Sequence, residues 1–158
     1  ISTLSKGMRM KFSLVLALSH EADLLIMDEP TSGLDPLIRN QLMNILLEFM
    51  QKEGKSVFFS THITSDLDKI ADVIILINDG QIVFQEEKDA LLDTFKKVKG
   101  NPKDLSEETR KLFLSIQETE YGFVGISKNT AQIKSTCKNL LTEKPTIEDI
   151  MLGYIGGV

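Results

Sequence analysis

The sequence has little of what several classes of protein require. Its one cysteine, Cys137, excludes an internal disulfide and fits a reducing compartment. The net charge is −5, so the chain as a whole offers no basic surface and we expect no nucleic-acid partner. No apolar run approaches the roughly 18 residues of a membrane-spanning helix. The N-terminus shows no charged segment followed by an apolar core, and we therefore expect no signal peptide.

What is present is typical of a globular domain. Hydrophobic residues make up 42% and charged residues 26% of a 158-residue chain, which is enough for a sizeable core. Periodicity and turn signals predict strands over 24–28, 57–59, 73–77, 81–85, 112–117 and 123–127. They predict helices over 5–19, 35–52, 65–71, 130–141 and 146–154, and an amphipathic segment over 88–97. The first of these helices is apolar on most sides, so we expect it to be largely buried.

Alternating strands and helices predict the fold class α/β, with a parallel sheet flanked by helices. The composition shifts near Gly100, Asn101 and Pro102, which we interpret as a domain edge or linker. We therefore expect two domains, over 1–98 and 99–158.

The stretch from Leu24 to Asp35 is the most informative part of the chain. It reads Leu-Leu-Ile-Met-Asp-Glu-Pro-Thr-Ser-Gly-Leu-Asp, so that Asp28 and Glu29 stand side by side after an apolar strand. A strand end fixes both carboxylates on rigid backbone, and the pleat points them to different sides. Asp28 can then hold Mg²⁺ through water, and Glu29 can polarise a water that attacks a phosphate.

Two further motifs have matching chemistry. Ser5 and Gly7 lie at a predicted helix start, where free N–H groups and the helix dipole form an anion site, and Lys6 adds a positive charge. His62 follows the second apolar strand, from where an imidazole can reach a phosphate or Glu29. Asp35 precedes Pro36 and can cap the helix that follows.

In this order and spacing, three motifs resemble those of ABC ATPases. Leu4-Ser5-Lys6-Gly7-Met8 resembles the signature motif, Leu24 to Asp35 the Walker B motif with its D-loop, and Ser60-Thr61-His62 the switch histidine. The signature motif departs from the usual Leu-Ser-Gly-Gly-Gln, since lysine replaces the first glycine and methionine the glutamine. The resemblance covers roughly residues 1–90.

The resemblance implies a role for each of these residues. Asp28 would be the metal ligand for Mg²⁺, Glu29 the catalytic base, and His62 the residue that orients the attacking water. The ATP contacts would come from Ser5, Lys6 and Gly7, which grip the γ-phosphate held by a partner subunit. Asp35 would make a contact across the dimer interface.

A phosphate-binding loop is missing from this sequence. Gly54, Lys55 and Ser56 spell the end of one, but Phe49 stands where the loop needs its first glycine. The triplet also follows a helix and opens a strand, so we interpret it as a helix C-cap. The chain opens on Ile1 rather than Met, directly before a motif, and we expect it to be the C-terminal part of a longer ATPase, inactive by itself.

The implied fold is part of a P-loop NTPase (RecA-like) sheet with a small C-terminal α+β extension. In the ABC core, one strand upstream of this chain lies between the strands at 57–60 and 73–77. Without it we expect those two strands to pair directly, to accept a strand from a neighbouring chain, or to stay mobile. The strands at 24–28 and 57–60 should remain parallel neighbours.

The tail from Pro145 to Gly157 resembles the closing segment of ABC-2-type bacterial exporter ATPases. The resemblance therefore implies the ATP-hydrolysing subunit of an exporter at the cytoplasmic face of the cell membrane. It would form a head-to-tail dimer with a second ATPase subunit and drive an integral-membrane permease. Two alternatives remain open: a non-transport ABC ATPase of translation or DNA repair, and a dimerisation or binding module without activity.

Overall fold

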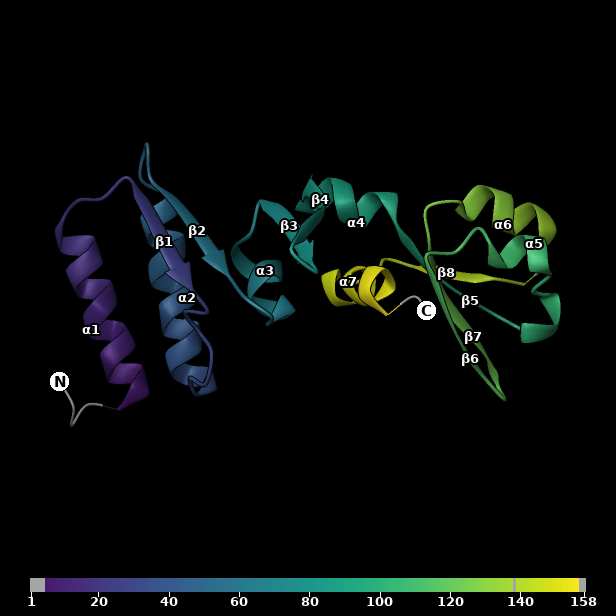
Figure 1. The fold of residues 1–158 in the computed structure, drawn as a ribbon, viewed down its shortest axis with the longest axis horizontal. Coiled ribbons are helices and arrows are strands. Elements are labelled where there is room, and N and C mark those ends of the chain that lie inside the picture. The colour runs from purple at the N-terminus through teal and green to yellow at the C-terminus, as the bar shows by residue number, and fades with distance from the viewer. Residues whose placement is uncertain (1–4, 138, 157–158) are drawn as a thin grey trace. The chain divides into compact units, whose positions relative to one another are not determined.

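The structure is a computed structural model that describes residues 5–137 and 139–156 (Figure 1). The chain folds as two compact units, which divide between Ile70 and Ala71 and are described separately. None of the helices in the described ranges has the length and apolar character needed to cross a membrane.

The described residues of unit 1 form three helices and one pair of strands. Its elements are α1 (Lys6–Ser19), β1 (Leu24–Asp28), α2 (Pro36–Met50), β2 (Ser56–Ser60) and α3 (Thr64–Ile70). The strands β1 and β2 are parallel, with Leu24 opposite Ser56 and Asp28 opposite Ser60. Their carboxyl ends therefore meet at one edge, and the segments that follow both strands start from the same place.

The core of unit 1 lies along the buried face of α2. Its apolar residues recur at helical spacing and pack with residues of the sheet and of the other two helices. The buried members are Leu14, Leu25, Leu42, Met43, Leu46, Phe49 and Ile70. The opposite face of the sheet is open among the described residues, since Leu24, Ile26 and Phe58 are 49%, 71% and 58% exposed.

The expectation that the first helix is largely buried is wrong for this chain. In α1, Leu14 is buried, whereas Met8, Phe12, Val15 and Leu16 are exposed. The helix α1 packs against α2 through one side. The remaining apolar side chains of α1 are not covered by any described residue of unit 1. An apolar pattern all round a helix predicts burial, but it does not say which segment provides the cover.

Unit 2 begins with a hairpin and continues into a second sheet. Its elements are β3 (Val73–Asn78), β4 (Gln81–Glu87), α4 (Lys88–Thr94), β5 (Lys96–Gly100), the 3₁₀ turn η1 (Pro102–Asp104), α5 (Glu107–Arg110), β6 (Ser115–Thr119), β7 (Gly122–Ser127), α6 (Thr130–Thr136), β8 (Leu141–Glu143) and α7 (Ile147–Ile155). The hairpin β3–β4 turns at Asp79 and Gly80, both with positive φ, which matches the twist of antiparallel strands.

The second sheet has the strand order β6-β7-β5-β8 and is antiparallel throughout. With α5 between β5 and β6, and α6 between β7 and β8, this is the β-α-β-β-α-β arrangement of ferredoxin-like domains. Val98 and Phe123 from the sheet pack with Leu105 and Ile133 as its core. The α+β extension predicted from the sequence is therefore confirmed, and so is the α/β fold class.

Two strands of this sheet were not predicted. The amphipathic segment 88–97 ends as a helix at Thr94, and β5 follows directly. The predicted helix 130–141 stops at Thr136, and Leu141 instead begins β8. In both cases strand pairing with distant residues overrides the local helical pattern.

The predicted domain boundary does not coincide with the division into compact units. The split at residues 98 and 99 falls inside β5, which pairs with β7 and β8. Gly100, Asn101 and Pro102 form the end of that strand and the following turn, so the composition shift marks a turn within unit 2. The extent of the ATPase domain along the chain stays a prediction.

The prediction that β1 and β2 are parallel neighbours is confirmed. In the described ranges β2 pairs with β1 within unit 1, and β3 pairs with β4 within unit 2. The triplet Gly54 to Ser56 forms a turn and a strand start, with Gly54 at φ +74°. The interpretation of this triplet as the helix C-cap is wrong, because α2 ends at Met50 and its C-cap is Gln51.

Candidate functional site

The carboxyl ends of β1 and β2 hold the two acidic residues that the sequence singles out. Asp28 ends β1, and its Oδ1 accepts a hydrogen bond of 2.5 Å from the Ser60 hydroxyl. The Glu29 N–H donates to the carbonyl and to the Oγ of Ser60, at 3.2 and 3.1 Å. Ser60 therefore fixes the position of both acidic residues from the neighbouring strand.

Glu29 has a left-handed backbone with φ +46°. A residue other than glycine in this region costs roughly 1–2 kcal/mol, and such residues gather at functional sites. The conformation ends the strand at Asp28. The two carboxylates differ in direction because the backbone turns here, in addition to the alternation of a strand.

The side chain of Glu29 meets His62, which follows β2. Glu29 Oε1 lies 2.8 Å from His62 Nδ1. The histidine side chain is 70% exposed and the glutamate side chain 34% exposed. The other carboxylate oxygen, Oε2, is buried without a hydrogen-bond partner among the described residues. The pair thus presents an imidazole to solvent and fixes the carboxylate that it contacts.

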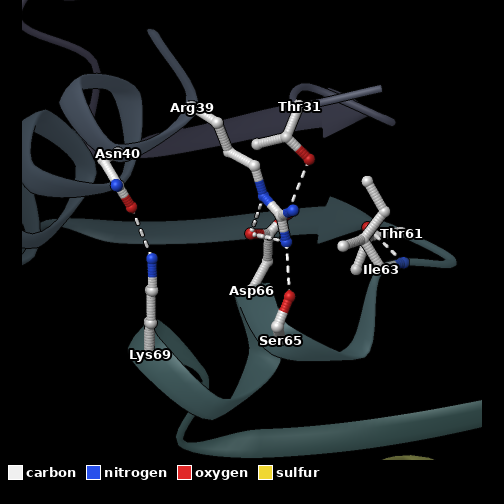
Figure 2. A network of polar contacts seen from close by, with 8 residues as sticks. All are labelled: Thr31, Arg39, Asn40, Thr61, Ile63, Ser65, Asp66 and Lys69. Carbon is white, nitrogen blue, oxygen red and sulfur yellow. Dashed lines mark hydrogen bonds and ion pairs between the residues drawn. The ribbon is translucent and has the colours of Figure 1, made fainter. Parts of the chain in front are cut away.

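A buried network beside this pair was missed by sequence reasoning (Figure 2). Asp66, in the first turn of α3, has no exposed surface. Its Oδ2 accepts from the Thr31 hydroxyl at 2.5 Å, and its Oδ1 accepts from Arg39 Nε at 2.7 Å. Arg39 also donates to the Ser65 hydroxyl at 2.6 Å. One sequence signal was available, since Asp66 lies four residues before the buried Ile70 and so shares its helix face.

Two of the remaining predicted site residues, Ser5 and Asp35, act as helix caps. Ser5 caps α1, its Oγ accepting from the Met8 N–H at 3.2 Å. Asp35 caps α2, its Oδ1 accepting from the N–H groups of Leu37 and Ile38. The side chain of Lys6 lies outside the described part of the structure.

Gly7 has a packing role in addition to the predicted anion contact. A Cβ at this position would lie 3.2 Å from Ile38 Cγ2, tighter than ordinary contact. The absence of a side chain therefore lets the start of α1 approach α2 closely. Whether the same residue also contacts a phosphate stays a prediction.

The carboxylate of Asp28 fits a Mg²⁺ site that is shared with a nucleotide and water. Among the described residues, no group of three or more His, Cys, Asp and Glu side chains could hold a metal. Mg²⁺ is commonly bound by one or two carboxylates together with phosphates and waters. Asp28 would supply one such carboxylate, and the remaining ligands would have to come from a nucleotide and water.

Comparisons with known proteins agree with the motifs. Residues 1–67 match the family profile described as "AAA domain, putative AbiEii toxin, Type IV TA system". An "uncharacterized ABC transporter ATP-binding protein" of Nostoc sp. is 40% identical over 88 residues, which are 56% of this chain and 26% of the relative. The "Nod factor export ATP-binding protein I" of Sinorhizobium fredii is 27% identical and matches 99% of this chain and 48% of its own length.

A solved structure supports the fold. It is titled "An inward-facing conformation of a putative metal-chelate type ABC transporter", with a TM-score of 0.53 and 21% identity over 90% of this chain and 49% of that one. The chain thus spans less than half the length of the two curated relatives and of the matched structure. On its three motifs and these relatives, the chain resembles the ATP-binding proteins of ABC transporters, and the solved structure has a similar fold.

Proposed function

We propose that this chain carries the hydrolytic residues of an ABC exporter's ATPase subunit. The observation that carries the proposal is the 2.8 Å contact between Glu29 Oε1 and His62 Nδ1 at the joined ends of β1 and β2. A base must lie within hydrogen-bond reach of the water it activates and must be held in orientation. Here His62 engages Oε1 of Glu29 and holds the carboxylate in orientation.

The other residues bind and orient. Asp28 is proposed to hold Mg²⁺, which neutralises charge on the phosphates of ATP when bound. The N-terminus of the 14-residue helix α1, with Ser5, Lys6 and Gly7, would receive the γ-phosphate of ATP held by a second subunit. Asp35 would lie at the contact between the two subunits. The phosphate-binding loop would come from outside this chain.

The transport role rests on the relatives. The Sinorhizobium relative named for export matches 99% of this chain, including the tail. We therefore propose a head-to-tail dimer of ATPase subunits that drives an integral-membrane permease from the cytoplasmic face of the membrane. Co-purification of the longer protein with a membrane-spanning subunit, and stimulation of its ATPase activity by that subunit, would support this role. An ATPase that associates with ribosomes or DNA instead would contradict it.

The hydrolytic assignment is tested by Glu29→Gln in the longer protein that we expect to carry this chain. The amide keeps the shape and removes the base, so ATP should still bind while turnover falls by about 10²-fold or more. His62→Ala should act in the same direction. The matched control is His20→Ala, since His20 is an exposed residue that closes α1. Steady-state ATPase activity of Glu29→Gln near that of the unaltered protein would show that the assignment is wrong.

A further inference from the structure

The carboxylate of Asp66 is a buried charge of unit 1, and each of its oxygens accepts a hydrogen bond. Its side chain has no exposed surface, and a buried carboxylate is costly unless each oxygen is hydrogen-bonded. Arg39 Nε donates to Oδ1 at 2.7 Å, and Arg39 Nη2 lies 2.7 Å from the same oxygen in an ion pair. Thr31 donates to Oδ2 at 2.5 Å. Each oxygen therefore has its own donor, and rotation of the carboxylate would break both contacts.

Thr31 and Asp66 belong to the two segments that carry the hydrolytic pair, and Arg39 belongs to α2. Thr31 lies two residues after Glu29, in the turn between β1 and α2. Asp66 lies four residues after His62, where the chain leaves β2 and enters α3. Figure 2 shows Thr31 and Arg39 reaching the carboxylate of Asp66, and Ser65 reaching Arg39. One buried carboxylate thus joins the chain just beyond Glu29 to the chain just beyond His62.

The turn that contains Thr31 is short and internally bonded. The Ser32 N–H donates to the Glu29 carbonyl, and the Leu34 N–H donates to the Thr31 carbonyl, both at 3.1 Å. Thr31 is itself 1% exposed. A displacement of its side chain would therefore be transmitted to the left-handed backbone of Glu29 rather than absorbed by a loose loop.

We propose that Thr31 and Asp66 are positioning residues, which hold the carboxylate of Glu29 and the imidazole of His62 at contact distance. This inference rests on the proposed function in one respect: the proposed function gives the contact between Glu29 and His62 its role in hydrolysis. Neither residue touches the reacting atoms in this assignment. A shift of the order of 1 Å in a catalytic group can cost about 10²-fold in rate.

Thr31→Val is the informative variant, because valine keeps the shape and removes the hydroxyl donor. Thr31→Ser keeps the hydroxyl and is the conservative rescue. Lys69→Ala is the matched control, since Lys69 Nζ joins α3 to Asn40 of α2 at 2.5 Å on the exposed side, away from the carboxylate. The control separates loosening of the two helices from loss of the buried contact.

The first measurement uses this chain labelled with ¹⁵N-histidine. It contains two histidines, so the ring signals of His62 can be read with His20 as the internal reference. Glu29→Ala defines the His62 signals without the carboxylate. We expect Thr31→Val to move them most of the way to that position, and Thr31→Ser and Lys69→Ala to leave them near the unaltered protein. If Thr31→Val moves them no more than Lys69→Ala does, the proposal is overturned.

The second measurement separates this proposal from the hydrolytic one. In the longer protein, Thr31→Val should lower kcat about 10-fold to 10²-fold with KM for ATP nearly unchanged, and Thr31→Ser should restore kcat. A loss confined to KM overturns the positioning role. If Glu29→Gln leaves ATPase activity intact while Thr31→Val still shifts the His62 signals, the coupling stands and the proposed function is the part that fails.

Discussion

Replacing Arg39 with methionine should destabilise unit 1 by about 2–3 kcal/mol. Removing one partner of a fully buried ion pair costs roughly 3–5 kcal/mol, because the other charge is left uncompensated. Asp66 is fully buried, but the Arg39 side chain is 24% exposed and Thr31 still donates to Oδ2 in the variant. Water can therefore reach part of the vacated position, which places the expected cost at or below the lower end of that range.

Hydrogen exchange is the appropriate assay, because it reports each unit separately. The chain has no tryptophan and both tyrosines, Tyr121 and Tyr154, lie in unit 2, so intrinsic fluorescence would not follow unit 1. With 1.4 kcal/mol for each factor of ten, amides of α2 and β2 that exchange by opening of unit 1 should exchange about 30-fold to 150-fold faster in Arg39→Met.

Two further variants make this prediction refutable. Lys69→Met removes an exposed link between the same helices and should change exchange little, since exposed polar pairs contribute roughly 0–1 kcal/mol. Adding Asp66→Leu to Arg39→Met should recover stability, because no buried charge then remains. Exchange in Arg39→Met within twofold of Lys69→Met would refute the reasoning, as would a double variant less stable than the single one.

Three other predictions follow from the sequence and from unit 2. The 158-residue chain alone should neither bind ATP tightly nor hydrolyse it, because the loop that makes most phosphate contacts is missing, and micromolar affinity by titration calorimetry would contradict this. Gly125→Ala should destabilise unit 2 by about 1–3 kcal/mol in urea titrations followed by tyrosine fluorescence, since its Cβ would lie 2.5 Å from Phe113, and Phe113→Leu should recover part of the loss. Burial alone would raise the pKa of Asp149, but hydrogen bonds from Lys97 and Thr146 hold the pKa below its ordinary value. The free energy of unfolding of unit 2 should therefore fall as the pH drops below about 4, and it should fall less steeply in Asp149→Asn. The same dependence on acidic pH in Asp149→Asn and in the unaltered chain would contradict the assignment.

The elements of unit 1 could be predicted because local signals and tertiary structure agree there. The strand from Leu24 to Asp28 is an apolar run ended by acidic residues and a turn, and the structure has the same bounds. The helix after Asp35 begins with a capping carboxylate and Pro36 and buries the apolar stripe read from the sequence. Each choice of residue favours the same local structure.

The strands β5 and β8 could not be predicted because their pairing is non-local. Lys96 to Gly100 contains three lysines and has little β-propensity of its own, yet it pairs on both sides. For the same reason the network around Asp66 escaped prediction. The motif identifies Glu29 and His62, but the position of Thr31 relative to Asp66 follows only from the register of β1 and β2.

The strand order of the ferredoxin-like sheet has a consequence for synthesis of the chain. Its central strand β5 is made first, and its two neighbours, Gly122–Ser127 and Leu141–Glu143, leave the ribosome much later. Until then both edges of the nascent strand are open to other chains. Lys96, Lys97 and Lys99 give this unpaired strand a positive charge that disfavours aggregation. In the folded unit Lys97 and Lys99 pair with Asp149 and Glu143, which are made later, so the charges that protect the unfinished strand become contacts of the finished one.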